Sequence, residues 1–425
     1  MAGIFFCVTA LSLFIIATPV FIAMLVPTFL TMEFFGPAIP AAAIVSRMVA
    51  GINKFSLLAI PLFIFSADII ARGEIGVRLL KMVESMIGHI TGGVAITTAV
   101  ACALFGAISG IGAAAVVTIG PIVYPTLLRQ GYSRGFAVGL ILCSSTLAML
   151  IPPSVAVIIY SLQTMSSVGA VFLSGLSAGV VFTALIAAYS YYYARKNNIG
   201  RQDRASTRER ITSIKRSFWA VGLPVIIFGG IYSGAFTPTE AAGTACIYAI
   251  IVESLIYRKL PLRDILNVSA DSAMVISTLM ILITAGSVVT YYLTLNQVPQ
   301  MISDMLGGHS RLVILLIINL IFLVAGMLID PSSAIIVLSP LIFPAAMAAG
   351  IDPIHLGAVI VMNVAIGMIT PPFGMNIFLG IVTFKVPYYE IVRHSMPFIA
   401  VAILGLLLVT YIPGLVTWLP HAVGY

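Results

Sequence analysis

Two clusters of small polar residues interrupt apolar sequence in the second half of the chain, and both offer oxygen atoms. One reads Gly-Met-Leu-Ile-Asp-Pro-Ser-Ser from Gly326 and contains the carboxylate of Asp330; the other reads Gly-Met-Ile-Thr-Pro-Pro-Phe-Gly from Gly367. A carboxylate within a membrane segment costs several kcal/mol unless it faces water or a partner. Prolines remove backbone donors and free carbonyl oxygens upstream, and free carbonyls at membrane depth must line a wet or protein-filled site. This chemistry suits a hard cation bound by oxygen.

The same pattern occurs 219 residues earlier in the chain. Pro152 and Pro371 are 219 residues apart, and so are Pro121 and Pro340. The first half therefore also contains a Pro-Pro break, and a small-residue break runs from Gly106 to Gly112 and includes Ser109. Broken helices at matching positions of two halves are the best sequence pointer to the binding site of a transporter.

The composition is that of a helical membrane protein. Of the 425 residues, 60% are hydrophobic and only 8% are charged. The long apolar runs lack the alternation of a membrane barrel, which leaves a polytopic all-α fold. The formal net charge of +7 does not indicate nucleic-acid binding, because the basic residues lie in loops, where the orientation rule for membrane proteins explains them. The four cysteines lie in apolar runs and are interpreted as core residues.

Each half is predicted to hold a re-entrant helical hairpin followed by a broken helix. The predicted pieces are a hairpin at 94–128 with its tip at Ser109–Gly112, a broken helix at 134–163, a second hairpin at 311–347 with its tip at Asp330–Ser333, and a second broken helix at 353–383. Each arm of the first hairpin is expected to be too short to cross a membrane alone.

The remaining segments are predicted to form spans and two interfacial arms. The spans are expected at 55–71, 169–194, 217–234, 239–257, 271–295 and 396–418, the amphipathic arms at 73–89 and 299–308, and an interfacial stretch at 37–50. Residues 4–31 are predicted to form either one long tilted helix or two short ones. The side of the membrane on which Met1 lies therefore stays open.

A strongly basic loop at 195–216 separates the two repeats, which are assigned to residues 1–194 and 217–425. The loop has eight basic residues against Asp203 and Glu209, so it is predicted to be cytoplasmic. Five crossings lie between the starts of the two broken helices. Because five is odd, the second repeat is expected to be inverted, so the hairpins enter from opposite faces and their tips meet near the midplane.

The polar residues at the breaks are the candidates for binding. They are Ser109, Ser144, Ser145, Ser154, Asp330, Ser332, Ser333, Asn363, Thr370 and Asn376. The structural alternative is that Ser and Thr bond their own helices and that Asp330 is the partner of a helix N-terminus. Glu240 is expected to be a first-turn carboxylate at a helix start.

Several motifs carry a resemblance to a known family. They are Phe236-Thr-Pro-Thr-Glu-Ala-Ala, Leu328-Ile-Asp-Pro, Ile369-Thr-Pro-Pro-Phe-Gly-Met-Asn, Ile108-Ser-Gly and Ile151-Pro-Pro-Ser. Over nearly its whole length the chain resembles the large membrane subunit of tripartite ATP-independent periplasmic (TRAP) transporters. The resemblance implies a Na⁺-driven importer of small organic acid anions, of the C4-dicarboxylate or sialic acid class, in the bacterial inner membrane. It also implies an elevator motion, a soluble periplasmic binding protein and a small four-helix membrane subunit as partners, and surrounding lipid.

The resemblance also implies two or more Na⁺ ions and a set of site residues. One Na⁺ site would use Ser109 and Gly110 with the carbonyls of Ala148 and Ile151; a second would use Gly326, Gly367 and Thr370; the anion would lie near Ser109, Ser154, Asp330 and Asn376. Because Asp330 repels an anion, it is expected to act through a cation, a water or an Arg-like partner. Ile111 stands where the family usually has a second hydroxyl, which leaves only backbone carbonyls there.

Two other functions remain as alternatives. A stand-alone Na⁺-coupled dicarboxylate symporter can share the inverted repeats and hairpins. An intramembrane hydrolase is more remote, although Ala107-Ile-Ser-Gly resembles a membrane serine-protease turn. Such an enzyme needs a base within hydrogen-bond reach of its nucleophile, and His355 and His394 lie near span ends.

Overall fold

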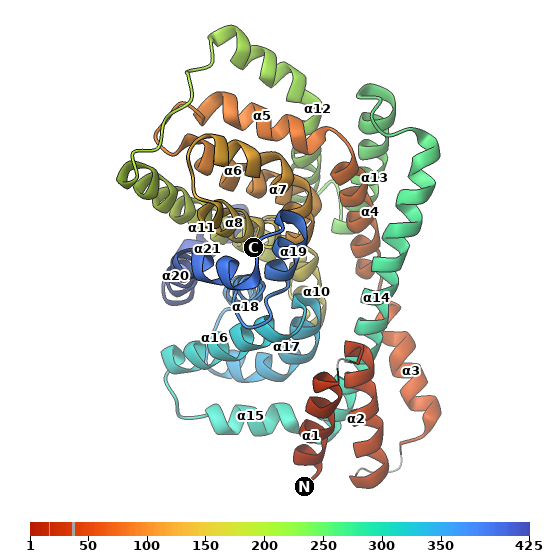
Figure 1. Ribbon diagram of the computed structural model, residues 1–425. Coiled ribbons are helices and arrows are strands. Elements are labelled where there is room, and N and C mark those ends of the chain that lie inside the picture. The colour runs from red at the N-terminus through yellow and green to blue at the C-terminus, as the bar shows by residue number, and fades with distance from the viewer. Residues whose placement is uncertain (17, 36–38) are drawn as a thin grey trace.

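The structure is a computed structural model, and it describes residues 1–16, 18–35 and 39–425. Across these residues the regular elements are helices (Figure 1). They are α1 (Ala2–Ile15), α2 (Val20–Phe35), α3 (Ala41–Ile52), η1 (Phe55–Leu58), α4 (Ala59–Arg72), α5 (Ile75–Ile87), α6 (Gly93–Ser109), α7 (Gly112–Arg129), α8 (Arg134–Ser145), α9 (Leu147–Leu150), α10 (Val155–Thr164), α11 (Val168–Lys196), α12 (Thr207–Tyr232), α13 (Pro238–Ile250), the π-helix η2 (Ile251–Ile256), α14 (Leu262–Leu295), α15 (Val298–Leu306), α16 (Arg311–Leu328), α17 (Pro331–Ala348), α18 (Pro353–Gly367), α19 (Met375–Phe384), α20 (Tyr388–Tyr411) and α21 (Gly414–Val423). In this described part, nine helices are long and apolar enough to cross a membrane, or up to ten if the bent pair α8–α10 counts as one span.

The order of helices in the first half recurs in the second. Adding 219 to the bounds of α7 gives those of α17, and α8 and α18 begin at Arg134 and Pro353, which are also 219 residues apart. The arms α5 and α15 lie at opposite ends of the molecule (Figure 1). The helices thus follow the offset that the sequence shows.

The two hairpins are antiparallel helix pairs with tight tips. The α6–α7 pair turns at Gly110, whose φ of +63° is the left-handed conformation that favours glycine, and the α16–α17 pair turns at Ile329 and Asp330. The prediction that each arm of the first hairpin is too short to span was wrong for α7, which has 18 residues and passes as a span by length and composition, as do α16 and α17, whereas α6 is shorter. Pro121 and Pro340 do not end their helices, since packed neighbours can satisfy the freed carbonyl groups.

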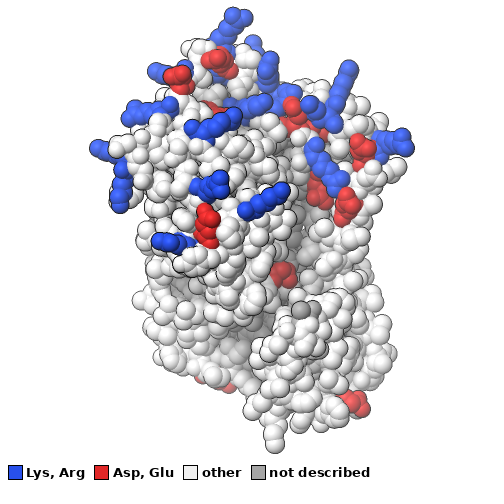
Figure 2. Space-filling view, viewed as in Figure 1, with Lys and Arg blue, Asp and Glu red and all other residues white. Residues whose placement is uncertain are grey.

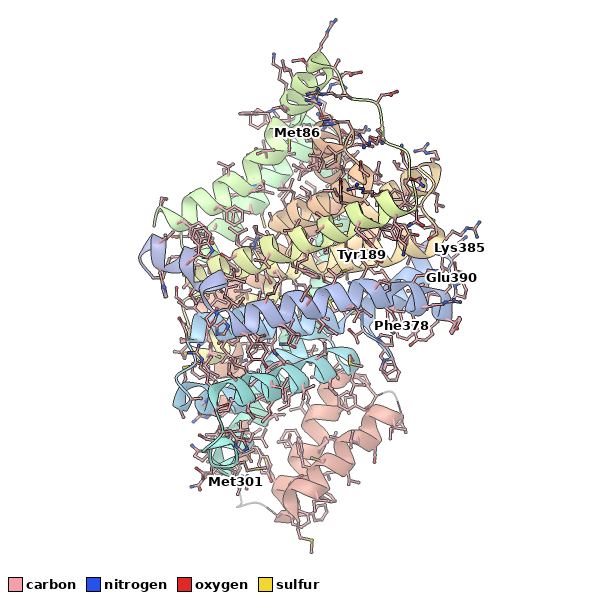
Figure 3. The ribbon with its side chains drawn as sticks, turned by 90° about the vertical axis from the view of Figure 1, so that its left-hand side faces the viewer. Met86, Tyr189, Met301, Phe378, Lys385 and Glu390 are labelled. Carbon is pink, nitrogen blue, oxygen red and sulfur yellow. The ribbon has the colours of Figure 1, made fainter. Side chains whose placement is uncertain are left out.

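The predicted Pro-Pro breaks interrupt both long apolar segments. The first segment bends by 42° between α8–α9 and α10, where Ser154 caps α10 by accepting a hydrogen bond of 3.4 Å from the Val157 N–H. The second segment breaks between α18 and α19. Figure 3 shows the long helices α11 and α20 side by side, with the Tyr189 ring 5.0 Å from that of Phe398.

The N-terminal residues form two short helices, which settles one of the open alternatives. The Phe5 ring lies 6.0 Å from the Phe34 ring and 5.3 Å from the Phe35 ring, so α1 and α2 run antiparallel. The N-terminus lies at the end opposite to the one where most Lys and Arg side chains gather (Figures 1 and 2). Residues 37 and 38 of the predicted interfacial stretch lie outside the described residues, and residues 41–52 form α3, which packs on α14.

Several predicted boundaries were wrong, and the basic loop is the main case. Only residues 197–206 connect α11 to α12 without helix. A capping box starts α12, because the Ser206 hydroxyl accepts from the Glu209 N–H at 3.2 Å and the Glu209 carboxylate accepts from the Ser206 N–H at 2.7 Å. Arg, Lys and Glu are good helix formers, so the high charge of residues 195–216 does not prevent most of them from being helical. Likewise α14 begins at Leu262 rather than 271, and α20 ends at Tyr411 before the separate helix α21.

Two bodies of helices face each other across the molecule (Figure 1). We call α1–α4 and α12–α14 the scaffold, and α6–α11 with α16–α21 the hairpin bundle. Inside the bundle the two halves are joined, since the Tyr160 hydroxyl of α10 donates to the Pro353 carbonyl at 2.7 Å. The scaffold meets the bundle where α14 packs on α17; there Gly286 lies against the side chain of Ile336. The arms connect the two bodies.

Candidate functional site

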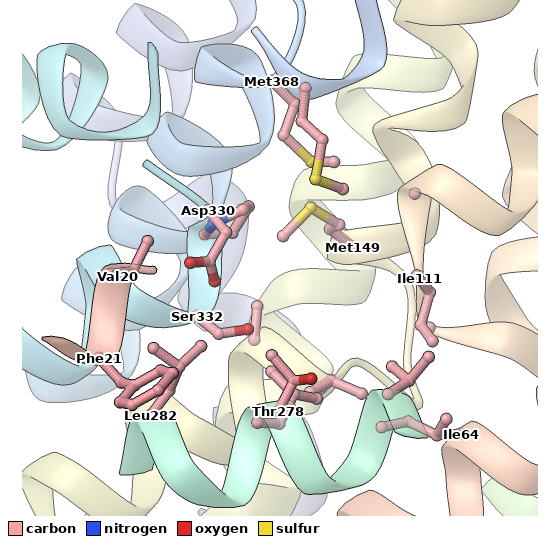
Figure 4. Close-up of a pocket in the computed structure, with 18 of the residues that line it drawn as sticks. Val20, Phe21, Ile64, Ile111, Met149, Thr278, Leu282, Asp330, Ser332 and Met368 are labelled. Carbon is pink, nitrogen blue, oxygen red and sulfur yellow. The ribbon is translucent and has the colours of Figure 1, made fainter. Parts of the chain in front are cut away.

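Residues of both hairpin tips, and residues that flank both breaks, line one cavity of about 670 Å³ between the bundle and the scaffold (Figure 4). The tips contribute Gly110, Ile111, Gly112, Asp330, Pro331 and Ser332; the segments around the breaks contribute Met149, Val155, Ala156, Met368 and Met375; the scaffold contributes Pro19, Val20, Phe21, Ile64, Val275, Thr278, Leu279 and Leu282. The predicted meeting of the two tips is therefore seen in the structure. The cavity is mostly apolar, and Asp330 is the one charged residue among its described lining.

The first tip is packed tightly against the first break. A Cβ atom added to Gly110 would collide with the carbonyl oxygen of Pro153, and one added to Gly106 would collide with the backbone of Ala148. Ser109 is fully buried, and its hydroxyl has no hydrogen-bond partner among the described residues. Because an unpaired buried hydroxyl is costly, this oxygen is available to a ligand.

The second tip and break repeat this packing with glycine on both sides. A Cβ atom at Gly326 would lie 3.3 Å from the Gly367 Cα, so the backbones of α16 and α18 touch. The Thr370 hydroxyl donates to the Ile366 carbonyl at 2.8 Å, which leaves its oxygen lone pairs free to accept. A Cβ atom at Gly374 would lie 2.8 Å from the Met368 carbonyl oxygen and 2.9 Å from that of Thr370. Two carbonyl groups thus converge on one glycine.

Asp330 has the structural role that the sequence left as an alternative. Its carboxylate caps α17 by accepting from the Ser333 N–H at 3.0 Å and from the Ser333 hydroxyl at 2.5 Å. The side chain also lines the cavity, with its carboxylate on the side of Val20 and Ser332 (Figure 4), so capping and ligand contact are compatible. Among the described residues that line the cavity there is no Lys or Arg. Of the three partners expected for Asp330, the Arg-like one is therefore not found there.

The other three candidates for solute contact are buried next to the cavity rather than in its wall. Ser109, Ser154 and Asn376 are fully buried, and each is the chain neighbour of a lining residue. The Ser154 hydroxyl caps α10. The Asn376 side-chain amide donates to the Ser145 hydroxyl at 2.9 Å, while its Oδ1 has no partner in the part of the chain that the structure describes. These side chains shape the site from behind its surface.

Sequence analysis did not predict two features near the site. The scaffold side of the cavity, including Phe21 and Thr278, carried no signal because these residues lie in ordinary apolar helices. A buried amide network was also missed: the Asn363 amide donates to Asn319 Oδ1 at 2.8 Å, and the Asn319 amide donates to the Thr410 hydroxyl at 3.1 Å. Asn319, an amide within an apolar run, was the available signal for this link between α16, α18 and α20.

Comparison with known proteins identifies the family. The model of the family described as "Tripartite ATP-independent periplasmic transporter, DctM component" matches residues 7–415. The ectoine/5-hydroxyectoine TRAP transporter large permease protein UehC of Ruegeria pomeroyi is 39% identical over 394 residues, which cover 92% of each chain. The C4-dicarboxylate TRAP transporter large permease protein DctM of Pseudomonas aeruginosa is 37% identical over 374 residues, 88% of each chain.

A solved structure supports the fold alone. The Alcanivorax borkumensis YdaH transporter superposes with a TM-score of 0.69 at 12% identity, covering 94% of this chain and 98% of its own. Proteins of the matching family are multi-pass transporters of the inner membrane rather than enzymes, which sets the hydrolase alternative aside. They work with a substrate-binding protein and usually with a small membrane subunit. From its motifs, its helices and its full-length relatives, the chain is a member of the TRAP transporter family, the large permease subunit of a binding-protein-dependent transporter.

Proposed function

We propose that this permease couples the inward movement of Na⁺ to the import of a small organic acid. The observation that carries the proposal is that both oxygen-bearing tips, and residues that flank both Pro-Pro breaks, line one cavity between two bodies of helices. Cavities of this kind, formed by broken helices from both halves, are the binding sites of secondary transporters.

The Na⁺ sites are proposed at the two tip–break contacts. The first would use Ser109 and Gly110 with the carbonyls of Ala148 and Ile151, and the unpaired buried hydroxyl of Ser109 supports it. The second would use Gly326, Gly367 and Thr370. Its support is the close approach of α16 and α18 and the pair of carbonyl groups next to Gly374. All of these ligands are hard oxygens, which hard cations prefer.

The solute is proposed to be a small molecule with a carboxylate, of a size that the cavity of about 670 Å³ can hold. The names of the relatives point to ectoines and to C4-dicarboxylates, and both classes carry a carboxylate. Asp330 would repel that group. A cation or water between them is therefore part of the proposal, and a bound Na⁺ would make solute binding depend on the ion.

The proposed mechanism is an elevator motion of the hairpin bundle along the scaffold. The scaffold meets the bundle where α14 packs on α17, and in this proposal the bundle moves along that contact; the arms α5 and α15 lie at opposite ends (Figure 1). We propose that the hairpins enter the membrane from opposite faces, so that each tip opens the site to one side in turn. The binding protein would deliver solute at the face of Asp304 and Asp352, and a small four-helix subunit would cover the scaffold.

Reconstitution tests the proposal and separates it from a stand-alone symporter. The purified chain is placed in proteoliposomes with and without the small subunit and the binding protein, and uptake of labelled ectoine, succinate or sialic acid is measured under an inward Na⁺ gradient. Uptake is expected only with all three proteins and Na⁺. Uptake driven equally well by choline chloride would contradict Na⁺ coupling. Uptake by the chain alone, unchanged by the binding protein, would show a stand-alone symporter.

A further inference from the structure

A polar groove of about 630 Å³ lies away from the solute cavity, between the arm α5 and the start of α12. It is lined by Glu74, Arg78, Lys81, Arg208, Glu209, Thr212, Ser213, Arg216 and Ser217. Four of these nine side chains are basic, three are hydroxyls and two are acidic. The groove lies at the end of the molecule where Lys and Arg side chains gather (Figure 2).

The two acidic residues and Arg78 are already engaged within the protein. The Arg78 guanidinium donates to Glu74 at 2.8 Å and to the Arg216 carbonyl at 3.0 Å, and it stacks 3.8 Å from the centre of the Tyr257 ring. The Glu209 carboxylate caps α12 at Ser206. These contacts engage Arg78, Glu74 and Glu209 within the protein. The other basic side chains of the groove remain able to bind a ligand.

Three cations at the groove have no acidic partner in the described part of the chain. Lys81, Arg208 and Arg216 are exposed, and none forms an ion pair there. The Thr212 hydroxyl lies among them but already donates to the Arg208 carbonyl at 2.7 Å, so the hydroxyl donor at this place is that of Ser213. Guanidinium, ammonium and hydroxyl groups in one concave site form the donor set that recognises a phosphate group.

The surroundings place this groove at the level of lipid headgroups. Trp219 is one helical turn beyond Arg216, is 40% exposed, and contacts the rings of Phe218 and Tyr248. Tryptophan and tyrosine gather at the boundary between membrane and water. Phe218 is 66% exposed and lies on another face of α12 than the residues that line the groove.

From this arrangement we propose that the groove binds the phosphate of an anionic phospholipid from the adjoining leaflet. A lipid bound there would contact the arm and the scaffold helix at once and hold α5 against α12. Basic pockets beside membrane helices are known to bind anionic headgroups. The groove is separate from the solute cavity, so a test of lipid binding there does not depend on whether the proposed transport function is correct.

Quenching of Trp219 by brominated lipid tests the site. The chain has two tryptophans, and Trp418→Phe leaves Trp219 as the only reporter. The full-length protein is reconstituted in vesicles of brominated phosphatidylcholine or of brominated phosphatidylglycerol. The relative binding constant for phosphatidylglycerol is expected to be about tenfold above that for phosphatidylcholine. It should fall close to one in the triple variant Lys81→Gln, Arg208→Gln, Arg216→Gln.

The matched control removes the same charge outside the groove, with Arg201→Gln, Arg204→Gln and Lys215→Gln. It should keep the preference, and an equal loss in both variants would show only general attraction to the surface and overturn the proposal. Inorganic phosphate is added as a competitor, because displacement of the brominated lipid by phosphate would identify a free anion as the occupant instead. If the triple variant does not fold, the single change Arg208→Gln gives the same comparison, and an unchanged preference there counts against the site.

Discussion

At the scale of single residues, the site depends on oxygen atoms that stabilise a helix by a hydrogen bond and can also contact a ligand. Asp330 caps α17 and also faces the cavity. The Thr370 hydroxyl donates to its own helix at Ile366 and can still accept a cation through its oxygen. A hydroxyl bonded to its own helix is therefore not excluded from binding, and the test must separate the two roles.

Thr370→Val removes the oxygen and keeps the shape of the side chain. Uptake by the complete transporter is expected to need a several-fold higher Na⁺ concentration for its half-maximal rate, since one ligand worth about 1 kcal/mol is lost. Thr370→Ser should behave like the parent. The control is Thr183→Val in α11, whose hydroxyl also bonds the carbonyl four residues earlier, at 2.7 Å. If both valine variants shift the Na⁺ dependence alike, or neither does, Thr370 is not a Na⁺ ligand.

Glu74 gives a pH-dependent contribution to stability on the arm. Partial burial opposes its ionisation, but the hydrogen bond and charge of Arg78, with Lys259, outweigh burial and hold the pKa of Glu74 below its ordinary value of 4.5. A lowered pKa stabilises the folded protein above pH 4.5, and this stabilisation is lost as the pH falls through the folded value. Because the pair is partly exposed, it contributes about 1 kcal/mol or less.

Glu74→Gln should therefore lower the melting temperature slightly at pH 7, and the difference from the parent should shrink below pH 4.5. Thermal unfolding in neutral detergent measures it. The Glu253 carboxylate accepts from the Glu74 N–H, so the comparison is made between variant and parent at each pH. A difference that stays constant down to pH 3 would mean that Glu74 acts by packing and not by its charge.

At the scale of helices, the breaks are held together by close backbone contacts. Gly326 on α16 and Gly367 on α18 touch, and Gly106 on α6 touches Ala148 on α9. Small residues let membrane helices approach closely enough for dispersion and polar contacts to hold them. The cost is that no side chain fits between them. These contacts set the distance from each hairpin tip to its break.

Gly367→Ala should separate α16 from α18, since its Cβ would collide with the backbone of Gly326. The expected loss is about 1–3 kcal/mol of stability, as for overpacking elsewhere, with a weaker apparent Na⁺ affinity. Thermal unfolding with and without Na⁺ measures both. Gly229→Ala is the control, because no atom lies within 4 Å of its added Cβ, and it should leave stability equal or slightly higher. An alanine tolerated at 367 would show that the contact is not tight.

At the scale of the whole molecule, charge is distributed unevenly between the two ends. Lys and Arg gather at the end of α5 and α12, while α15 and the N-terminus lie at the other (Figures 1 and 2). Cytoplasmic segments of membrane proteins carry the excess of basic residues. The α5 end is therefore expected in the cytoplasm, and the two arms are expected on opposite sides of the membrane.

Cysteine labelling in intact cells checks this orientation. The exposed Cys7 is first changed to Ser, and the other three cysteines are buried. A cysteine at Asp304 is expected to react with an impermeant maleimide added from outside, and a cysteine at Arg204 only after the inner membrane is permeabilised. Reaction at 204 but not at 304 in intact cells would reverse the orientation.

The sequence by itself determined the membrane class, the repeat with its offset of 219, the positions of the tips and breaks, and the arms. These follow from local chemistry: proline and glycine break helices wherever they stand, and the capping box at Thr237 and Glu240 forms within four residues, with the Glu240 N–H 3.3 Å from the Thr237 hydroxyl. The predicted start of α12 was wrong because a highly charged stretch was interpreted as a loop. The Ser206–Glu209 capping box that starts the helix could also have been recognised in the sequence.

Only the tertiary structure decided which faces meet. It brought Phe21 and Thr278 of the scaffold to the cavity, placed Ser109, Ser154 and Asn376 behind its wall, and left Asp330 as the charged residue of the described lining. The physical reason is that an apolar helix face is equally satisfied by lipid and by another helix. Its sequence therefore does not say which it will touch, and that choice depends on shape complementarity between residues far apart in the chain.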